Sequence, residues 1–214
     1  MTPQVQLLDF GCHDTSKNLP KTTATPPKET LSLNAFEPVY FGHQQEQLSQ
    51  SYLLSAGREF ALEGYGRADL LFIQTLQEPQ STPQLSAQFQ SDIILTAFEL
   101  KLTDWRKGLT QASRYRYFSN RSILVTPPKI AKTALSYIQT FKDLQIGLWE
   151  FNEDSLALHK HFTPIISKPY NPKANTKALN VLNKAKPTRA LVFPPNFSNN
   201  HLSALQTAEG HHCP

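Results

Sequence analysis

The chain has 214 residues, of which 39% are hydrophobic and 18% charged, so it can bury the core of one ordinary domain. No apolar run approaches membrane-spanning length, which excludes an integral membrane protein, and nothing at the start resembles a secretory signal. The two cysteines, Cys12 and Cys213, stand at opposite ends and form no disulfide framework, so we expect a cytoplasmic protein. The net charge of +4 permits a nucleic-acid partner without requiring one.

Composition predicts three segments. Residues 1–30 are expected to be a flexible tail, because 15–30 (TSKNLPKTTATPPKET) are rich in Thr, Pro and Lys and show no periodicity. Residues 167–214 are expected to be a basic extension rich in Pro, Asn and Lys, with room for a short helix around 176–184. The remaining residues, 31–166, are expected to form the folded domain.

Helical and strand patterns alternate within that domain. The elements we expect, in chain order, are a helix over 41–54, a strand over 68–73, a long hairpin loop or insertion over 74–90, a strand over 92–102, a helix over 103–118 capped by Thr103 or Asp104, a strand over 122–126, a helix over 130–141, and two strands over 146–151 and 156–162. This alternation predicts a mixed α/β domain.

Asp69 and Glu99 are the residues on which a chemical function depends. Asp69 lies at the head of an apolar strand, and Glu99 and Lys101 share one face of the second strand because strand side chains alternate. If the two strands pair, two carboxylates and an ammonium converge. Hard oxygen ligands of this kind hold Mg²⁺ for phosphodiester hydrolysis, and a lysine beside the metal stabilises the charge on phosphorus.

The helix expected over 103–118 is basic. Lys107, Gln111, Arg114 and Phe118 form one stripe on it, at spacings of 4, 3 and 4 residues. Seven Lys or Arg and a single acid, Asp104, occur from residue 101 to residue 129, interleaved with aromatic residues. This pattern favours contact with a phosphate backbone.

These stretches together resemble the PD-(D/E)XK nuclease superfamily. The resemblance is carried by GYGRADLLFI (64–73), AFELK (97–101), TDWRKGLTQASRYRYF (103–118) and the SILVTPP strand, and it spans about residues 44–128. It implies a restriction-endonuclease-like core, in which helices flank a mixed sheet in the order αβββαβ, with an extra C-terminal hairpin here. It also implies cleavage of DNA with Mg²⁺ or Mn²⁺, leaving 5′-phosphate and 3′-hydroxyl ends.

The resemblance also implies roles for individual residues. Asp69 and Glu99 would be metal carboxylates, the Leu100 carbonyl a further ligand and Lys101 the catalytic lysine. Gln111 would match a glutamine that many members carry on the following helix, and Glu46 a metal carboxylate that some members carry on the preceding one. The chain departs from the family pattern at Ala68, where members commonly have proline.

Each assignment has a simpler alternative. The Asp69, Glu99 and Lys101 set could be a surface salt-bridge group on an edge strand. Gln111 could bond a backbone group, Glu46 could be an ordinary surface acid, and Arg67 could clamp a phosphate or neutralise Asp69. Two further groups are weaker metal candidates: the pair His159 and His161 on one strand face, and the tail residues Cys12, His13, His211, His212 and Cys213.

We therefore expect a Mg²⁺-dependent DNA endonuclease with Asp69, Glu99, Lys101 and Gln111 in its active site. The candidates for phosphate contacts are Arg67, Lys107, Arg114, Arg116 and Arg121, of which Arg116 faces the core on a helical wheel. Cutting both strands with one site per subunit would need a homodimer. The alternatives are a non-catalytic nucleic-acid-binding module with the same fold and an adaptor that acts through its tails.

Overall fold

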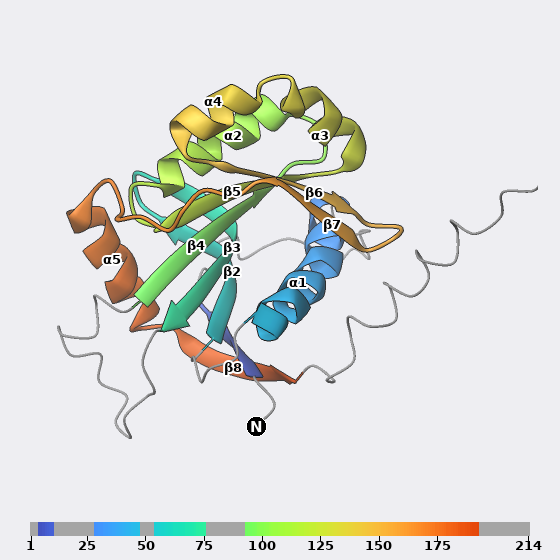
Figure 1. Cartoon of the computed structure of the whole chain (residues 1–214). Helices are drawn as coiled ribbons and strands as arrows, with labels where there is room; N and C mark the ends of the chain where they lie inside the picture. Colours follow the sequence, from blue (N-terminus) through green and yellow to red (C-terminus); the bar gives the residue numbers. More distant parts are fainter. Residues whose placement is uncertain (1–3, 11–27, 48–53, 76–92, 193–214) are drawn as a thin grey trace, which may run out of the picture.

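The computed structural model describes residues 4–10, 28–47, 54–75 and 93–192, which form an eight-stranded mixed sheet with helices on both faces (Figure 1). The strands are β1 (Gln4–Asp9), β2 (Leu54–Leu62), β3 (Gly66–Thr75), β4 (Ile93–Leu100), β5 (Arg121–Thr126), β6 (Gly147–Asn152), β7 (Ala157–Phe162) and β8 (Lys186–Val192). The helices are α1 (Lys28–Gln47), α2 (Trp105–Tyr115), α3 (Pro128–Leu135), α4 (Ile138–Leu144) and α5 (Pro172–Leu182). The predicted class, a mixed α/β domain with a central sheet flanked by helices, is confirmed.

The strands lie in the order β7-β6-β5-β4-β3-β2-β1-β8. The neighbours β2, β3 and β4 are antiparallel, whereas β4, β5 and β6 run parallel and are joined by crossover helices. From α1 to β5 the elements therefore follow one another as helix, three strands, helix and strand. This is the order αβββαβ that the resemblance implied, whereas the local patterns of the sequence predicted only two of the three strands.

Alternation along β4 assigns its side chains to two cores. Phe98 packs against Phe36 and Tyr40 of α1, with ring centroids 5.5 and 4.7 Å apart, so this side of the sheet faces α1. Leu95 and Ala97 belong to the core on the other side, which α2 and α5 cover. Glu99 alternates with Phe98, so it lies on the α2 side.

Asp104 begins α2. Its side chain accepts a hydrogen bond from the backbone N–H of Lys107 at 3.1 Å, which confirms the predicted cap at this end of the helix. Trp105, Leu109, Ala112 and Tyr115 recur at helical spacing and are buried against the sheet. Burial of this apolar stripe fixes how α2 is rotated over β4 and β5.

Two predicted helices differ from the observed ones. In place of the single helix expected over 130–141, the chain forms two helices, α3 and α4, which are separated at Ser136 and Tyr137. The sequence did not predict this break, because apolar periodicity alone does not show where a helix is interrupted. Residues 41–47 of the helix expected over 41–54 belong to α1, which begins at Lys28, residues 48–53 lie outside the described residues, and Leu54 already starts β2. The strand β2 was not predicted, because Ser55, Gly57, Arg58 and Glu59 interrupt its apolar alternation.

The predicted tail boundaries are wrong at both ends. Residues Gln4–Asp9, expected in a flexible tail, form β1, which pairs in parallel with β2 and antiparallel with β8. Residues 172–192 of the expected extension form α5 and β8. Short polar segments gain strand structure here because neighbouring strands satisfy their backbone groups, which composition does not reveal. The insertion expected over 74–90 lies almost wholly outside the described residues, as do the candidate tail ligands.

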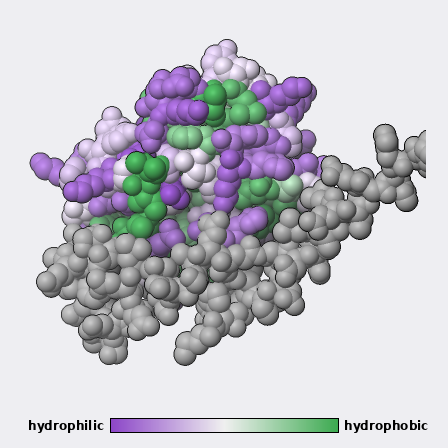
Figure 2. Space-filling model, viewed as in Figure 1, coloured by the Kyte–Doolittle hydropathy of each residue, from purple (hydrophilic) through white to green (hydrophobic). Residues whose placement is uncertain are grey.

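No helix among the described residues is long and apolar enough to cross a membrane. On the face shown in Figure 2, apolar side chains gather in separate patches bordered by hydrophilic ones, including one at the end of the molecule formed by α2, α3 and α4. Ile165, with 75% exposure, is the most exposed of the large apolar residues among those described.

Leu156 offers a test of backbone strain. It has φ of 55° in the turn between β6 and β7 and is 37% exposed, so it gains little from burial while it occupies a left-handed conformation. We expect Leu156→Gly to raise the free energy of unfolding by roughly 0.5–1 kcal/mol, because glycine adopts this φ without steric cost. Urea unfolding measures the change. Leu156→Ala keeps the strain and serves as the control, so an equal gain in both variants would contradict the interpretation.

Candidate active site

Antiparallel pairing of β3 with β4 brings the two predicted carboxylates together. The register pairs Leu70 with Phe98, so the next step places Asp69 opposite Glu99 at the end of β4. The Asp69 Oδ2 atom also accepts a hydrogen bond of 2.7 Å from the backbone N–H of Leu100. This bond fixes the Asp69 carboxylate at the point where β4 ends.

Glu99 is held from two elements. Its side chain is 1% exposed, its Oε1 atom lies 2.8 Å from the Lys101 ammonium, and its Oε2 atom accepts a hydrogen bond of 2.5 Å from the Tyr115 hydroxyl. The same hydroxyl lies 2.6 Å from the carbonyl oxygen of Arg67. Because Glu99 is buried on a central strand, the alternative of a surface salt bridge on an edge strand is wrong.

The charges around Glu99 set its protonation. Burial, followed by the nearby Asp69 carboxylate, raises the pKa of Glu99 to about 7, although the hydrogen bonds from Lys101 and Tyr115 act to lower it. Burial and the Glu99 carboxylate in turn raise the pKa of Tyr115, so its hydroxyl keeps its proton. Two acids facing each other in a buried position form an arrangement that a cation would stabilise.

One stripe of α2 lies against these side chains. Gly108 contacts the stem of Lys101, because a Cβ at position 108 would lie 2.7 Å from the Lys101 Cγ atom. Tyr115, seven residues later, reaches Glu99 from the same side of the helix. Gln111 lies between them, and its buried Oε1 atom has no hydrogen-bond partner in the part of the chain that the structure describes.

Tyr115 is the site residue that sequence reasoning missed. It belongs to the apolar core, and its hydroxyl also bonds Glu99. The available signal was its position four residues after Gln111, a spacing that makes two side chains neighbours on a helix. Gln111 itself lies where the sequence placed it, although its carbonyl oxygen does not bond Lys101.

Three of the predicted phosphate contacts are exposed. Lys107 and Arg114 lie on the outer surface of α2. Arg67 has a side chain 63% exposed, and its Nε atom lies 2.9 Å from a Glu59 carboxylate oxygen. The structure thus pairs Arg67 with Glu59, a partner that the sequence did not suggest.

The predictions for Arg116 and Arg121 are wrong. Arg116 is 1% exposed, and its guanidinium donates hydrogen bonds to the carbonyl of Ser119 and the hydroxyl of Ser167 at 2.5 and 2.7 Å. Arg121 lies on the opposite face of the sheet, where burial lowers its pKa and it interacts electrostatically with Tyr40 of α1. Neither residue contacts the site, because burial or strand alternation turns its side chain away.

The remaining metal candidates gain no support from the structure. Glu46 lies within α1, but its side chain is outside the described residues. His161 bonds Glu150 at 2.8 Å rather than pairing with His159. Across the described ranges, no group of three or more His, Cys, Asp or Glu side chains comes together.

The donors at the end of β4 nevertheless fit a hard divalent cation. Asp69 and Glu99 supply carboxylate oxygens, and the Leu100 carbonyl, 3.3 Å from the Lys101 ammonium, offers a third oxygen at the end of β4. Oxygen donors of this kind suit Mg²⁺ and Mn²⁺. Two carboxylates and a carbonyl leave coordination positions for water and substrate.

Comparisons of the chain with protein-family models, with curated proteins and with solved structures gave no match.

The raised pKa of Glu99 predicts a pH-dependent stability. Between pH 4.5 and about 7 the folded protein holds a proton that the unfolded chain has released, so the free energy of unfolding falls as the pH rises through this range. The shift corresponds to roughly 3 kcal/mol. We expect Glu99→Gln to remove this part of the pH dependence, measured by urea unfolding in EDTA. Parallel stability profiles for the two proteins would contradict it.

The contact between Gly108 and Lys101 predicts an energetic coupling. A Cβ at position 108 would also lie 2.5 Å from the Leu124 Cδ1 atom, so Gly108→Ala should displace both side chains at a cost of about 1–3 kcal/mol, partly offset by its better helix propensity. Lys101→Ala removes the Lys101 Cγ atom. We therefore expect Gly108→Ala to lower the free energy of unfolding by at least about 0.5 kcal/mol less in the Lys101→Ala variant than in the wild type. Urea unfolding of the four proteins in this cycle measures the coupling, and additive effects would contradict it.

Proposed function

We propose that this chain is a metal-dependent DNA endonuclease with its active site at the end of β4. The observation that carries the proposal is the convergence of Asp69, Glu99 and Lys101, with Glu99 buried and 2.8 Å from the lysine ammonium. A buried pair of acids beside a lysine is costly unless it serves a cation or a reaction. The resemblance of the surrounding sequence to PD-(D/E)XK nucleases supports the same conclusion.

The chain's own residues divide the work. Asp69, Glu99 and the Leu100 carbonyl would hold Mg²⁺ or Mn²⁺. When bound there, the ion would act as a Lewis acid, which would polarise the phosphate and lower the pKa of the attacking water. Lys101 brings a positive charge to the site, where it stabilises the negative charge that develops on the phosphate oxygens. Without an ion the pKa of Glu99 lies near neutrality, so an ion bound there would displace a proton from this carboxyl.

Neighbouring side chains position these groups. Tyr115 fixes the Glu99 carboxylate through its hydroxyl, and Gly108 leaves space for the Lys101 stem under α2. Gln111 presents a buried amide oxygen between the two, where it can accept a hydrogen bond from a water or from Lys101. We assign these three residues to positioning.

The surface of α2 supplies the contacts to DNA. Lys107 and Arg114 are exposed on the helix that packs over the site, and Arg67 is exposed at the start of β3. Contacts to phosphates make binding fall as the salt concentration rises. The corrected set of phosphate contacts is therefore Arg67, Lys107 and Arg114.

A cleavage assay tests the proposal. Linear, supercoiled, single-stranded and branched DNA are incubated with the full chain in Mg²⁺, Mn²⁺ or EDTA. We expect metal-dependent cutting. Lys101→Ala and Glu99→Ala should each reduce the cleavage rate by about 100-fold or more, as is usual when a group that stabilises the charge of a transition state is removed. Lys177→Ala is the matched control, because this lysine of α5 is exposed, pairs with Glu63 and lies outside the proposed site.

The same assay, combined with a DNA-binding measurement, distinguishes the nuclease from its alternative, a non-catalytic nucleic-acid-binding module. No cutting by the wild type, together with equal and salt-sensitive DNA binding by wild type and Glu99→Ala, would overturn the enzyme assignment and favour a binding module. Negligible DNA affinity even at low salt would overturn both and favour an adaptor.

A further inference from the structure

Three tyrosines form a continuous aromatic surface beside the C-terminal end of α2. Tyr65 lies in the turn between β2 and β3, Tyr117 follows α2, and Tyr170 precedes α5. The ring centroid of Tyr117 lies 5.7 Å from that of Tyr65 and 6.0 Å from that of Tyr170. Tyr117 is 46% exposed and Tyr170 is 55% exposed, so both rings keep open surface although each meets a neighbour. We call these three residues the tyrosine platform.

Several contacts hold the rings of the tyrosine platform in place. The backbone N–H of Tyr170 donates a 2.9 Å hydrogen bond to the Arg116 carbonyl, and the Arg116 guanidinium lies 4.6 Å from the centre of the Tyr170 ring. The next residue, Asn171, donates from its backbone to the Tyr117 carbonyl at 3.0 Å and from its side chain to the Tyr65 hydroxyl at 3.0 Å. Rings that are fixed before binding lose little conformational freedom when a ligand stacks on them, which favours binding.

The tyrosine platform lies close to the proposed active site. Tyr65 precedes Asp69 by four residues, so the Cα atoms of the two are at most about 14 Å apart. Arg67 lies between them, and its carbonyl accepts the 2.6 Å hydrogen bond from the Tyr115 hydroxyl that also bonds Glu99. A DNA strand with a phosphate in the active site can therefore reach the platform within about four nucleotides, at roughly 3.4 Å of rise each.

Basic side chains surround the platform. Arg114 is exposed in the last turn of α2, and Lys168 and Lys173 are exposed on either side of Tyr170 in the chain. None of these three cations forms an ion pair with an acid in the part of the chain that the structure describes. From residue 164 to residue 192 the sequence contains no Asp or Glu. The charge beside the rings therefore suits an anionic partner.

Two acids of the hairpin formed by β2 and β3 lie near the platform in the chain. Glu63 precedes Tyr65 by two residues, and its carboxylate lies 2.8 Å from the Lys177 ammonium. Glu59 of β2 lies 2.9 Å from the Nε atom of Arg67. Because both acids have basic partners, they leave the positive charge of the surrounding side chains in excess.

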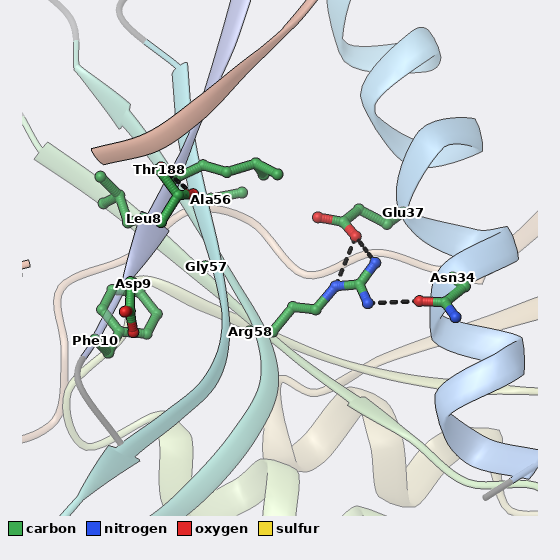
Figure 3. Close-up of a pocket in the computed structure, with 10 residues that line it drawn as sticks. Leu8, Asp9, Phe10, Asn34, Glu37, Ala56, Gly57, Arg58 and Thr188 are labelled. Atoms are coloured by element: carbon green, nitrogen blue, oxygen red, sulfur yellow. Dashed lines mark hydrogen bonds and ion pairs between the residues drawn. The ribbon is translucent and has the colours of Figure 1, made fainter. Parts of the chain in front are cut away.

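The pocket of about 410 Å³ on the opposite face of the sheet is a weaker candidate for an anionic partner. It lies between α1, β2 and the C-terminal end of β1 (Figure 3), and Arg58 is the one basic residue among the described residues that line it. The Arg58 guanidinium is already occupied. It bonds the Glu37 Oε2 atom through Nε at 2.7 Å and through Nη2, and the Asn34 side chain through Nη1 at 2.5 Å. The Glu37 Oε1 atom is buried and has no hydrogen-bond partner among the described residues, so an anion would meet an acid here rather than a free cation.

We propose that the tyrosine platform stacks unpaired DNA bases, so that the preferred substrate carries a single-stranded segment next to the bond that is cut. This inference rests on the proposed nuclease function and names the substrate class of the same site. In a duplex, the stacked neighbours of an internal base cover both of its faces, so exposed rings can stack only on bases that have left the helix. Aromatic stacking accepts every base, while Arg114, Lys168 and Lys173 neutralise the phosphates on either side.

Binding of oligonucleotides to the full chain in EDTA tests the stacking. The probes are an oligothymidine strand and an abasic strand of the same length, about 16 nucleotides, and fluorescence anisotropy measures their affinities. We expect oligothymidine to bind at least about 10-fold more tightly than the abasic strand, because the two carry the same phosphates and only one carries bases. Equal affinity for the two strands would overturn the proposal.

Substitutions locate the binding on the platform. Tyr117→Ala and Tyr170→Ala should each weaken oligothymidine binding at least about 5-fold and leave abasic binding unchanged, which also shows that the variants are folded. Tyr117→Phe keeps the ring and should bind as the wild type does. Tyr137→Ala is the matched control, because this tyrosine is 45% exposed and pairs with Trp105 rather than with the platform. An equal loss in Tyr137→Ala, or no loss in either platform variant, would contradict the assignment.

Cleavage in Mg²⁺ separates this inference from the proposed function. We expect the wild type to cut a duplex with a single-stranded branch at least about 10-fold faster than the same duplex without the branch, and Tyr117→Ala to lose this preference. Equal rates on both substrates would overturn the inference and leave the nuclease assignment standing. Base-dependent binding without any metal-dependent cutting would instead overturn the nuclease assignment and keep the stacking surface, as part of a binding module.

Discussion

The pairing of β3 with β4 is the constraint on which the site depends. Its register sets Asp69 opposite Glu99, and the alternation of β4 sends Phe98 into the aromatic core beneath α1 while Glu99 faces α2. A slip of one residue would exchange the two faces, burying Glu99 under α1 and exposing Phe98 to the α2 side. The apolar core therefore fixes the register, and the register places the charged groups.

Burying Glu99 beside Asp69 has a cost that the surrounding elements offset. The Lys101 ammonium and the Tyr115 hydroxyl both bond the Glu99 carboxylate, and Gly108 lets α2 pack closely against the Lys101 side chain. The pKa of Glu99 nevertheless remains raised to about 7. The opposite face carries a second costly acid, Glu37, half satisfied by Arg58. On each face of the sheet, therefore, a buried acid is paired with a basic side chain.

Local patterns in the sequence were enough to find much of this arrangement. Alternation along a strand predicted that Glu99 and Lys101 share a face, and the capping residue with apolar residues at helical spacing predicted α2. The prediction of phosphate contacts failed for Arg116, which is buried and bonds the carbonyl of nearby Ser119 and the hydroxyl of distant Ser167. It also failed for Arg121, which alternation alone could not assign to a face of the sheet. Both were included because of the local density of positive charge, which does not state where a side chain points, although the helical wheel had already placed Arg116 toward the core, where it lies.

The sequence by itself determined the class of the domain, the face shared by Glu99 and Lys101, and the cap and apolar face of α2, because these depend on patterns within one element. Only the tertiary structure decided which elements meet. It brought β1 and β8 into the sheet from segments with the composition of tails, gave Tyr115 its bond to Glu99, and set Glu37 against Arg58 across 21 residues. Contacts of this kind depend on strand order and helix docking, which are properties of the whole core and not of any local pattern.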